Sequence, residues 1–255
     1  MTNFRPAIIV MAKAPRLGRA KTRLRGVLTD EETRTLALAF FADTLRYARK
    51  ADLQIIIAFT PAAGLSELQG ATSTLEEMIW VEQADGDLGE RLIAAAEFAR
   101  SERFWPVVFL GTDCPNLPVE TVRFAMDHLE NDDADIVLGP SADGGYYLIG
   151  LSRFNRQILF QVPWSTAEAL EKTLANVASA GLRSALMDEW YDVDQPADLR
   201  RLREDVLVDP SSAPATHAWF EKYRDLRFFG VDDTSDRGTS DLLPPNRAAG
   251  ETSTE

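Results

Sequence analysis

The sequence has one cysteine and no long apolar run, and each shortage excludes a class of protein. Cys114 has no partner for an internal disulfide, and one cysteine is too few for a cysteine-rich zinc site. No apolar stretch approaches the roughly 20 residues that a membrane-spanning helix needs. Residues 1–6 are too short for a signal peptide and lead directly into an apolar run. We therefore expect a cytoplasmic protein with no membrane partner.

Basic residues are also scarce relative to acidic ones. The chain has 27 Lys and Arg against 40 Asp and Glu, which gives a formal net charge of -13. General nucleic-acid binding needs a basic surface, so we expect no nucleic-acid partner. The acidic balance does not exclude a mononucleotide ligand. With 255 residues and 45% hydrophobic content, the chain can build a real globular core.

One short stretch runs against this acidic background. Residues 13–25 contain six cations and no acid, and they follow the apolar run Ala7–Met11, which predicts a buried strand. Cations at the carboxyl end of a strand are typical of a phosphate or diphosphate site in an open α/β sheet. A solvated basic turn is the alternative. The candidate phosphate ligands are Lys13, Arg16, Lys21 and Arg23, with Gly18 at a bend.

Two common nucleotide-binding patterns are missing from this stretch. Lys21-Thr22 resembles the end of a P-loop, but Pro15 and Ala20 stand where that loop requires glycines. Those glycines let backbone amides close around a phosphate, so a P-loop is excluded. No Gly-x-Gly-x-x-Gly follows the first apolar run, which argues against a dinucleotide-binding fold.

Apolar runs alternate with amphipathic helical stretches along most of the chain. This alternation predicts an α/β fold, a three-layer α/β/α sandwich with a mostly parallel, mixed sheet. The short loop 141–145 leaves no room for a crossover helix, so we expect Tyr146–Leu151 to be an antiparallel or an edge strand. Thr29, with Glu32 three residues later, predicts a capping box that opens a helix, and so does Ser165 with Glu168.

The chain changes character after about residue 207. We expect a main domain over residues 1–207 and a C-terminal extension over 208–229 with one short helix within 217–229. Residues 230–255 carry six acids, two arginines and few apolar side chains, which predicts a disordered acidic tail.

Three aspartates are candidate metal ligands. Asp113 follows the apolar run Val107–Leu110, so it is expected at the carboxyl end of a buried strand, in the ligand crevice. Carboxylate oxygen suits Mg²⁺, which often takes only one or two carboxylates together with ligand phosphates. The alternative for Asp113 is a turn cap. Asp192 or Asp194 could supply a second carboxylate, although Asp194 could instead cap the helix that starts at Pro196.

Glycines and a tryptophan mark further candidate positions. Gly144 and Gly145 permit close approach of the backbone to a ligand, but they also suit a hairpin turn. Gly89 lies at an expected helix start, where free amides favour an anion, although an ordinary turn between strand and helix explains it equally well. Trp164 could stack on a base or a sugar, or act as a hydrophobic staple.

Taken together, these motifs resemble the DUF2064 branch of the GT-A nucleotide-diphospho-sugar transferase superfamily. Some members of that branch are named as glycosyltransferases linked to arsenosugar biosynthesis. The first loop and the last motif are also similar to molybdenum-cofactor and phospholactate nucleotidylyltransferases. The resemblance covers about residues 7–205, in order. Its motifs are Lys13-x-Pro15-x-x-Gly18-x-x-Lys21-Thr22-Arg23-Leu24, Gln83…Leu88-Gly89-x-Arg91, Gly111-x-Asp113-Cys114-Pro115, Asp143-Gly144-Gly145-Tyr146-Tyr147-Leu148-x-Gly150 and Asp192-Val193-Asp194-x-Pro196-x-Asp198-Leu199.

The resemblance implies a nucleotide-binding GT-A fold with Mg²⁺ or Mn²⁺ held at Asp113. GT-A glycosyltransferases often carry Asp-x-Asp, whereas this chain has Asp113-Cys114-Pro115, which moves the second metal ligand to Asp192 or Asp194. Gln83, Gly89 and Arg91 join the basic loop as expected phosphate-binding residues. Asp143 is the expected catalytic base and Lys21 a catalytic cation, and the expected acceptor-binding residues are Gly144, Gly145, Tyr146 and Trp164.

The leading functional prediction is metal-dependent transfer of a sugar from a nucleotide-diphosphate donor to a small-molecule acceptor. The alternative is nucleotidyl transfer, in which a phosphorylated small molecule attacks a nucleoside triphosphate and pyrophosphate leaves. A third alternative is a non-catalytic nucleotide-binding module. The expected ligands are therefore a nucleotide sugar or a nucleoside triphosphate.

Overall fold

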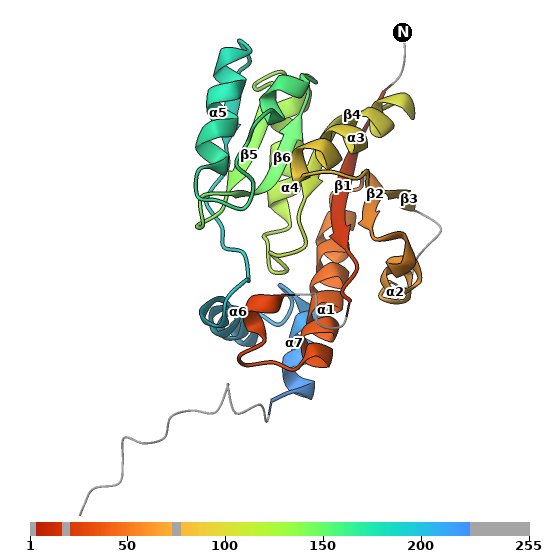
Figure 1. The fold of residues 1–255 in the computed structure, drawn as a ribbon, viewed down its shortest axis with the longest axis vertical. Helices are drawn as coiled ribbons and strands as arrows, with labels where there is room; N and C mark the ends of the chain where they lie inside the picture. The colour runs from red at the N-terminus through yellow and green to blue at the C-terminus, as the bar shows by residue number, and fades with distance from the viewer. Residues whose placement is uncertain (1–3, 17–20, 73–77, 225–255) are drawn as a thin grey trace, which may run out of the picture. The chain divides into compact units, whose positions relative to one another are not determined.

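The computed structural model describes residues 4–16, 21–72 and 78–224. Within these ranges seven strands form one mixed sheet in the order β3-β2-β1-β4-β6-β5-β7, with helices on both of its faces (Figure 1). The expected α/β sandwich is therefore confirmed. No helix in the described part of the chain is both long and apolar enough to cross a membrane.

The elements follow the alternation that the sequence predicts. The strands are β1 (Arg5–Lys13), β2 (Gln54–Thr60), β3 (Met78–Glu82), β4 (Phe104–Leu110), β5 (Ile136–Pro140), β6 (Tyr146–Leu151) and β7 (Ser184–Leu186). The α-helices are α1 (Asp30–Arg49), α2 (Leu65–Gly70), α3 (Leu88–Ser101), α4 (Glu120–Glu130), α5 (Ala169–Ser179), α6 (Pro196–Val208) and α7 (Pro214–Lys222). Short 3-10 turns lie at η1 (Thr22–Leu24), η2 (Ala62–Gly64) and η3 (Arg156–Leu159).

Alternate residues of β1 pack into two separate cores. Ile8 and Val10 lie in a core with Phe41 of α1, and that core also includes side chains of α4. Ile9 lies in the other core with Leu92 of α3, and Val177 of α5 belongs to that core too. Because successive side chains of a strand point to opposite faces, this division places α1 and α4 on one face of the sheet and α3 and α5 on the other.

The antiparallel strand lies inside the sheet. β6 pairs antiparallel with β4, where Leu110 lies opposite Leu148, and with β5, where Leu138 lies opposite Ile149. The expected antiparallel direction is confirmed, and the edge position is wrong. The strand has a partner on each side because β5 and β7 continue the sheet beyond it.

The two predicted capping boxes have different outcomes. At α1, the Thr29 hydroxyl accepts a hydrogen bond from the Glu32 amide at 3.2 Å, and the Glu32 carboxylate accepts one from the Thr29 amide at 2.7 Å. The box expected at Ser165 is wrong, since Ser165 has a left-handed backbone (φ 64°) and α5 starts at Ala169. A left-handed residue cannot occupy the extended position of an N-cap.

The strand order creates a crevice at the carboxyl ends of the strands, between β1 and β4. The chain runs from β1 through β2 to β3 on one side and places β4 on the other side of β1. Ligands bind in open α/β sheets at the carboxyl ends of strands where the order reverses in this way. The loops after Lys13 and after Leu110 start at that point.

The C-terminal helix α7 packs on α1. The Asp43 carboxylate of α1 accepts hydrogen bonds from the amides of Ala215 (2.9 Å) and Thr216 (2.8 Å), which are otherwise unpaired donors of the first turn of α7. The helix expected within 217–229 thus begins earlier, at Pro214, and ends at Lys222. The expected tail, residues 230–255, lies outside the described residues.

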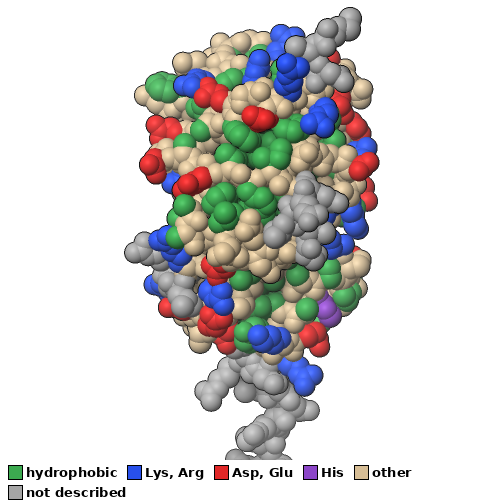
Figure 2. Space-filling view, turned by 90° about the vertical axis from the view of Figure 1, so that its right-hand side faces the viewer, with side chains coloured by type: hydrophobic (Ala, Val, Ile, Leu, Met, Phe, Trp, Pro, Cys, Tyr) green, Lys and Arg blue, Asp and Glu red, His purple; other side chains and the backbone are tan. Residues whose placement is uncertain are grey.

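Charges of both signs mix on the face of the molecule shown in Figure 2. Among its coloured side chains, acidic and basic groups are interspersed around apolar patches (Figure 2). At the carboxyl ends of β1 and β4 the two signs are separated, since basic residues follow β1 and an acidic residue follows β4.

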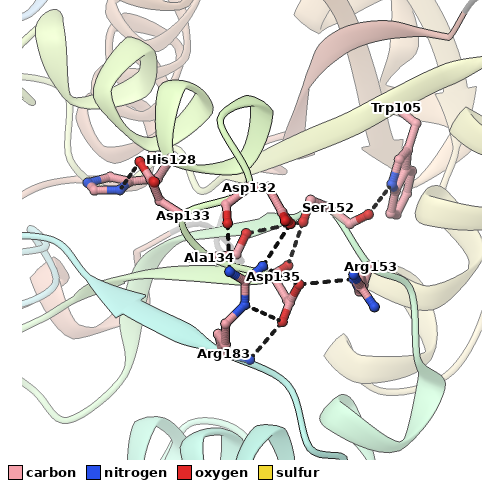
Figure 3. Close-up of polar contacts among 9 residues, drawn as sticks. All are labelled: Trp105, His128, Asp132, Asp133, Ala134, Asp135, Ser152, Arg153 and Arg183. Carbon is pink, nitrogen blue, oxygen red and sulfur yellow. Dashed lines mark hydrogen bonds and ion pairs between the residues drawn. The ribbon is translucent and has the colours of Figure 1, made fainter.

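An ion network ties β5, β6 and β7 together at the end of the sheet away from the crevice (Figure 3). Asp135, which is 3% exposed, accepts hydrogen bonds from the Arg183 amide (2.8 Å) and the Arg183 guanidinium (3.1 and 3.2 Å). Arg153 contributes a further contact of 3.0 Å to the same carboxylate. The hydrogen bonds from Arg183 hold the pKa of Asp135 below its usual value.

This network gives the first prediction. We expect Asp135→Asn to lower the free energy of unfolding at pH 7 by about 1–3 kcal/mol, because the buried carboxylate loses its charge-assisted hydrogen bonds from Arg183 and its ion pair with Arg153. A carboxyl group whose pKa is lower in the folded state than in the unfolded state stabilises the folded state at pH values above its unfolded pKa. This contribution is lost as the pH falls through the folded pKa. Urea unfolding of both proteins at pH 7 and at pH 3 measures it. The difference should shrink at pH 3, and Asp133→Asn, an exposed neighbour, should show little effect at either pH.

Candidate functional site

Lys21 joins the basic segment after β1 to two acidic segments. Its ammonium donates hydrogen bonds to the Val193 carbonyl (2.7 Å) and to Asp194 Oδ1 (3.0 Å), and it forms an ion pair with Asp113. Its side chain is only 8% exposed. Residues that lie 172 and 173 positions further along the chain thus contact the Lys21 ammonium group. In Figure 1, η1 and α6 accordingly lie side by side at the same end of the sheet.

The charge on Lys21 is stabilised by its neighbours. Burial by itself lowers the pKa of Lys21, but the attraction of Asp113 and Asp194 outweighs burial and holds the pKa above its usual value. The ring of Phe40 on α1 lies 5.5 Å from the ammonium and adds a cation–π contact. The three N–H donors of the ammonium are matched by three oxygen acceptors, so Lys21 has none left for a ligand.

Hydrogen bonds also fix the segment that carries Asp192 and Asp194. The Val193 amide donates to the Asp113 carbonyl at 2.9 Å, so the two acidic segments are bonded directly to each other. The expected alternative that Asp194 caps α6 is wrong. Asp198 reaches back instead and accepts from the amides of Asp194 (3.1 Å) and Gln195 (2.7 Å), which leaves the Asp194 carboxylate for Lys21.

A hydrogen-bond network holds the start of this segment against the loop after β4. The Tyr191 hydroxyl donates to Asp205 of α6 and accepts from the side-chain amide of Asn116 at 2.7 Å. Arg201 lies 3.8 Å above the Tyr191 ring. Asn116 follows Asp113 by three residues, so this network ties both acidic segments to α6.

Negative charge exceeds positive charge around these acids. The pKa of Asp192 is raised to about 6 by burial and by the neighbouring carboxylates Asp143 and Asp194. Lys21 is the buried cation of the group, and the Arg23 guanidinium lies 3.6 Å from Asp194 Oδ2. Repulsion among neighbouring carboxylates is relieved when a cation binds between them.

A cleft of about 740 Å³ opens along the carboxyl ends of β1 and β4. It brings the expected phosphate-binding cations together with Asp113 and Asp194. Within the described ranges, neither Lys13 nor Arg16 forms an ion pair or a side-chain hydrogen bond, so both remain available to an anion. The Arg91 guanidinium donates to the Gly86 carbonyl at 3.0 Å. The expected site residues that line this cleft are Lys13, Arg16, Lys21, Arg23, Arg91, Asp113, Tyr146 and Asp194.

A second cleft of about 250 Å³ adjoins the first. Leu88, Gly111, Asp113 and Tyr146 line both clefts. The remaining expected site residues in the second cleft are Asp143, Gly145, Trp164 and Asp192. Asp113 thus stands at the boundary between a cleft lined by cations and a cleft lined by acids and aromatic rings.

Four of the expected ligand residues are not found in either cleft. Three of them line neither cleft and have roles in packing or hydrogen bonding, and the fourth lies outside the described residues. The Gln83 amide donates to the Ala58 carbonyl at 2.7 Å and lines neither cleft. A Cβ on Gly89 would lie 3.1 Å from the Trp164 ring, so this glycine allows the ring to pack on α3. Gly144 sits in a turn with φ 86° and also lines neither cleft. Gly18 lies outside the described residues.

The turn at Gly144 gives the second prediction. A Cβ there would lie 2.3 Å from the Ala167 carbonyl oxygen, in addition to the cost of a positive φ. Gly181 has a similar φ of 68° but open space around its Cβ. We expect Gly144→Ala to lower the free energy of unfolding by about 2–4 kcal/mol and Gly181→Ala by about 1–2 kcal/mol. Equal losses in urea unfolding would show that Ala167 does not crowd this turn.

Sequence reasoning missed part of the walls of both clefts. Phe40 and Phe41 of α1 line the first cleft, and Ser165 and Thr166 line the second. The helical spacing of apolar residues in this part of the sequence gives no sign that the helix also faces a ligand cleft. Cys114 is buried, and burial raises the pKa of its thiol well above the usual value, which argues against a role as a nucleophile.

The donor set suits a divalent metal that arrives with a polyphosphate. Among the described residues no group of three or more His, Cys, Asp or Glu side chains could hold a metal ion. Asp113 and Asp194 share Lys21, whereas Asp192, whose pKa is raised to about 6 by burial and neighbouring carboxylates, has no ion pair within the described ranges. Because Mg²⁺ is commonly held by one or two carboxylates plus ligand phosphates, these acids fit a metal that phosphate oxygens help to coordinate.

A comparison with protein families adds to this geometry. The family described as "Uncharacterized protein conserved in bacteria (DUF2064)" matches residues 43–166. The resemblance to DUF2064 is confirmed. The matched DUF2064 range contains Asp113 and Asp143 and ends before Asp192, so the comparison covers one of the two acidic segments. No curated protein matches the sequence significantly.

Solved structures show similarity over a longer part of the chain than the family match. A protein of Desulfovibrio desulfuricans G20, provisionally assigned as a nucleotide-diphospho-sugar transferase, is 27% identical with a TM-score of 0.78. The alignment covers 89% of this chain and 99% of that chain. A cytidylyltransferase of Leptospira borgpetersenii serovar Hardjo-bovis (strain JB197) is 12% identical with a TM-score of 0.52, covers 87% and 94% of the two chains, and shows a shared fold alone.

The manganese complex of Rv0371C from Mycobacterium tuberculosis H37Rv is 25% identical and covers 79% of this chain and 100% of that chain. Its TM-score of 0.49 is too low to support any assignment here. The comparisons therefore confirm the fold class of nucleotide-diphospho-sugar transferases and support a transferase.

Proposed function

We propose that this DUF2064 protein is a metal-dependent glycosyltransferase that moves a sugar from a nucleotide-diphosphate donor to a small-molecule acceptor. The observation that carries the proposal is the meeting of the cationic segment after β1 with Asp113 and Asp194 in one cleft at the sheet's switch point. Cations bind the donor's phosphates, and carboxylates beside them suit the metal that accompanies a diphosphate.

Each group of residues has a separate task in this proposal. Lys13, Arg16, Arg23 and Arg91 bind the diphosphate from the walls of the first cleft. Asp113 with Asp192 or Asp194 would hold Mg²⁺ or Mn²⁺, which when bound neutralises charge on the leaving phosphate. Lys21 positions Asp113 and Asp194, because its own donors are already engaged. The catalytic contact expected for Lys21 is therefore replaced by a positioning role.

In the transfer step, the leaving nucleoside diphosphate takes an electron pair and a residue of this chain takes a proton. The acceptor hydroxyl oxygen forms a bond to the anomeric carbon, and the bond from that carbon to the diphosphate oxygen breaks. The electron pair of the broken bond leaves with the nucleoside diphosphate. The hydroxyl proton moves to the Asp143 carboxylate, which lines the adjoining cleft. We expect this reaction in the cytoplasm.

A second candidate function uses the same first cleft. In nucleotidyl transfer, the cations would bind the β- and γ-phosphates of a nucleoside triphosphate, and a phosphorylated molecule would attack the α-phosphate. Lys13 and Arg16, which have no ion pair within the described ranges, fit a triphosphate as well as a diphosphate. The two functions differ in what they release.

A product assay on the full chain is the third prediction. With Mn²⁺ or Mg²⁺ present, we expect slow release of nucleoside diphosphate from at least one UDP-, GDP- or other nucleotide sugar, measured by chromatography. Nucleoside triphosphates with sugar phosphates should release no pyrophosphate. Pyrophosphate release would favour the second candidate, and binding of nucleotide without turnover of any donor would indicate a non-catalytic module.

A further inference from the structure

The second cleft is lined by side chains of one charge sign. Asp113, Asp143 and Asp192 contribute carboxylates to it, and among the described residues no Lys, Arg or His lines it. A phosphorylated occupant would bring its negative charge among these acids with no Lys, Arg or His side chain to pair with it, and a metal held by Asp113 with Asp192 or Asp194 would still leave Asp143 uncompensated. Such like-charge contacts are a common means of rejecting a ligand. The lining of this cleft therefore disfavours anionic molecules.

Aromatic rings form the other wall of the second cleft. Trp164 and Tyr146 are in edge-to-face contact, with ring centroids 6.1 Å apart. Ligand pockets combine such apolar walls with a few polar groups that fix orientation. Here the exposed hydroxyl of Ser165 makes no side-chain hydrogen bond within the described ranges. A ring-shaped molecule with an apolar face and hydroxyl edges matches both walls.

The position of the second cleft also points to an acceptor. It shares Gly111 and Asp113 with the cleft that carries the cations, so its occupant lies beside the end of a bound diphosphate. Asp143 Oδ1 already accepts hydrogen bonds from the Ser141 hydroxyl (2.6 Å) and the Gly145 amide (2.9 Å). These bonds fix the carboxylate and leave Oδ2 as the oxygen for an acceptor hydroxyl.

We propose that the second cleft binds the acceptor, and that this acceptor is an uncharged, polyhydroxylated small molecule and not a phosphate ester. The identity of the occupant as an acceptor rests on the glycosyltransferase function proposed above. The inference that the occupant is uncharged rests only on the residues that line the second cleft. The volume of about 250 Å³ limits it to a small molecule.

Ligand-observed NMR on the full chain tests this proposal without turnover. The probes are glucose, ribose and glycerol, each paired with its phosphate ester, and the measured signal is saturation transfer from protein to ligand. We expect at least one uncharged probe to bind, with at least tenfold weaker binding of its phosphate ester. A phosphate ester that binds as well as its uncharged partner, or no signal from any uncharged probe, would overturn the proposal.

Two variants place the signal in the second cleft. Trp164→Ala should abolish the signal of the uncharged probe, and Ser165→Lys should narrow the difference between a probe and its phosphate ester. Ser179→Lys adds the same charge on an exposed face of α5 and should change neither. An unchanged ratio in Ser165→Lys would contradict the assignment, even where Trp164→Ala fails to fold.

A nucleoside diphosphate in the same experiment separates this proposal from the proposed function. UDP and GDP with Mg²⁺, which is diamagnetic and does not broaden the ligand signals, report on the first cleft and should keep their signals in Ser165→Lys. If the unmodified protein binds neither nucleotide, the proposed donor site is wrong, and the charge preference of the second cleft still stands. Nucleotide binding with a preference for phosphate esters would remove the acceptor proposal alone.

Discussion

Replacing Asp113 with asparagine is expected to lower the turnover of a nucleotide-activated donor by at least about 100-fold, since groups that stabilise charge in the transition state commonly contribute that much. The substitution keeps the size of the side chain and removes its charge. Asp113 stands where the two clefts meet, and half of its side chain is exposed there (51%). Because Lys21 still has Asp194, we expect the protein to remain folded.

Steady-state kinetics with the donor found by the product assay measures this effect. The loss should fall mainly on kcat, with thermal unfolding within a few degrees of the unmodified protein. Asp127→Asn, an exposed aspartate on α4 away from both clefts, is the matched control and should be silent. Turnover within a fewfold of normal in Asp113→Asn would exclude Asp113 from the metal site.

Replacing Lys21 with methionine is expected to affect both stability and activity. Methionine keeps much of the length of the side chain and its contact with Phe40, but it leaves Asp113 and Asp194 without their shared cation. Both acids are more than a third exposed, so water replaces part of the lost interaction. We expect a loss of about 1–3 kcal/mol in the free energy of unfolding and at least tenfold in kcat/KM.

The comparison that isolates Lys21 is Lys222→Met, which removes a lysine from the exposed end of α7. Urea unfolding and donor kinetics on both variants separate the two effects. A positioning role predicts that the kinetic loss in Lys21→Met persists well below the unfolding temperature. Normal kinetics with lowered stability would make Lys21 a purely structural residue.

Most of the architecture follows from local patterns in the sequence. The apolar run in β1 and the capping box at Thr29 depend on neighbours within a few residues, and both are present as predicted. The place of β6 inside the sheet depends on where β5 and β7 pair, which no local pattern encodes. The start of α5 was mistaken because Ser165 and Glu168 have the spacing of a capping box, while the backbone at Ser165 is left-handed.

The site was predictable as a set of charged segments but not as a set of contacts. Lys21 looked like a phosphate ligand because it stands in a run of cations, and its burial among Asp113, Asp194 and the Val193 carbonyl depends on residues far along the chain. Likewise, Asp194 looked like a cap because it precedes Pro196. The structure places Gln195 at the N-cap position, where Asp198 accepts a hydrogen bond from its amide, and the Asp194 carboxylate is bound by Lys21, which no local pattern indicates.

Calorimetric titration of a nucleoside diphosphate into the full chain, with Mn²⁺ and then with EDTA, tests the central claim most directly. If cations after β1 and acids after β4 hold one metal-bound diphosphate, binding should weaken at least tenfold in EDTA, and Asp113→Asn should show the weaker value under both conditions. Mn²⁺ alone should bind weakly, because ligand phosphates complete its coordination. Binding that is equally tight with Mn²⁺, with EDTA and in Asp113→Asn would contradict the account.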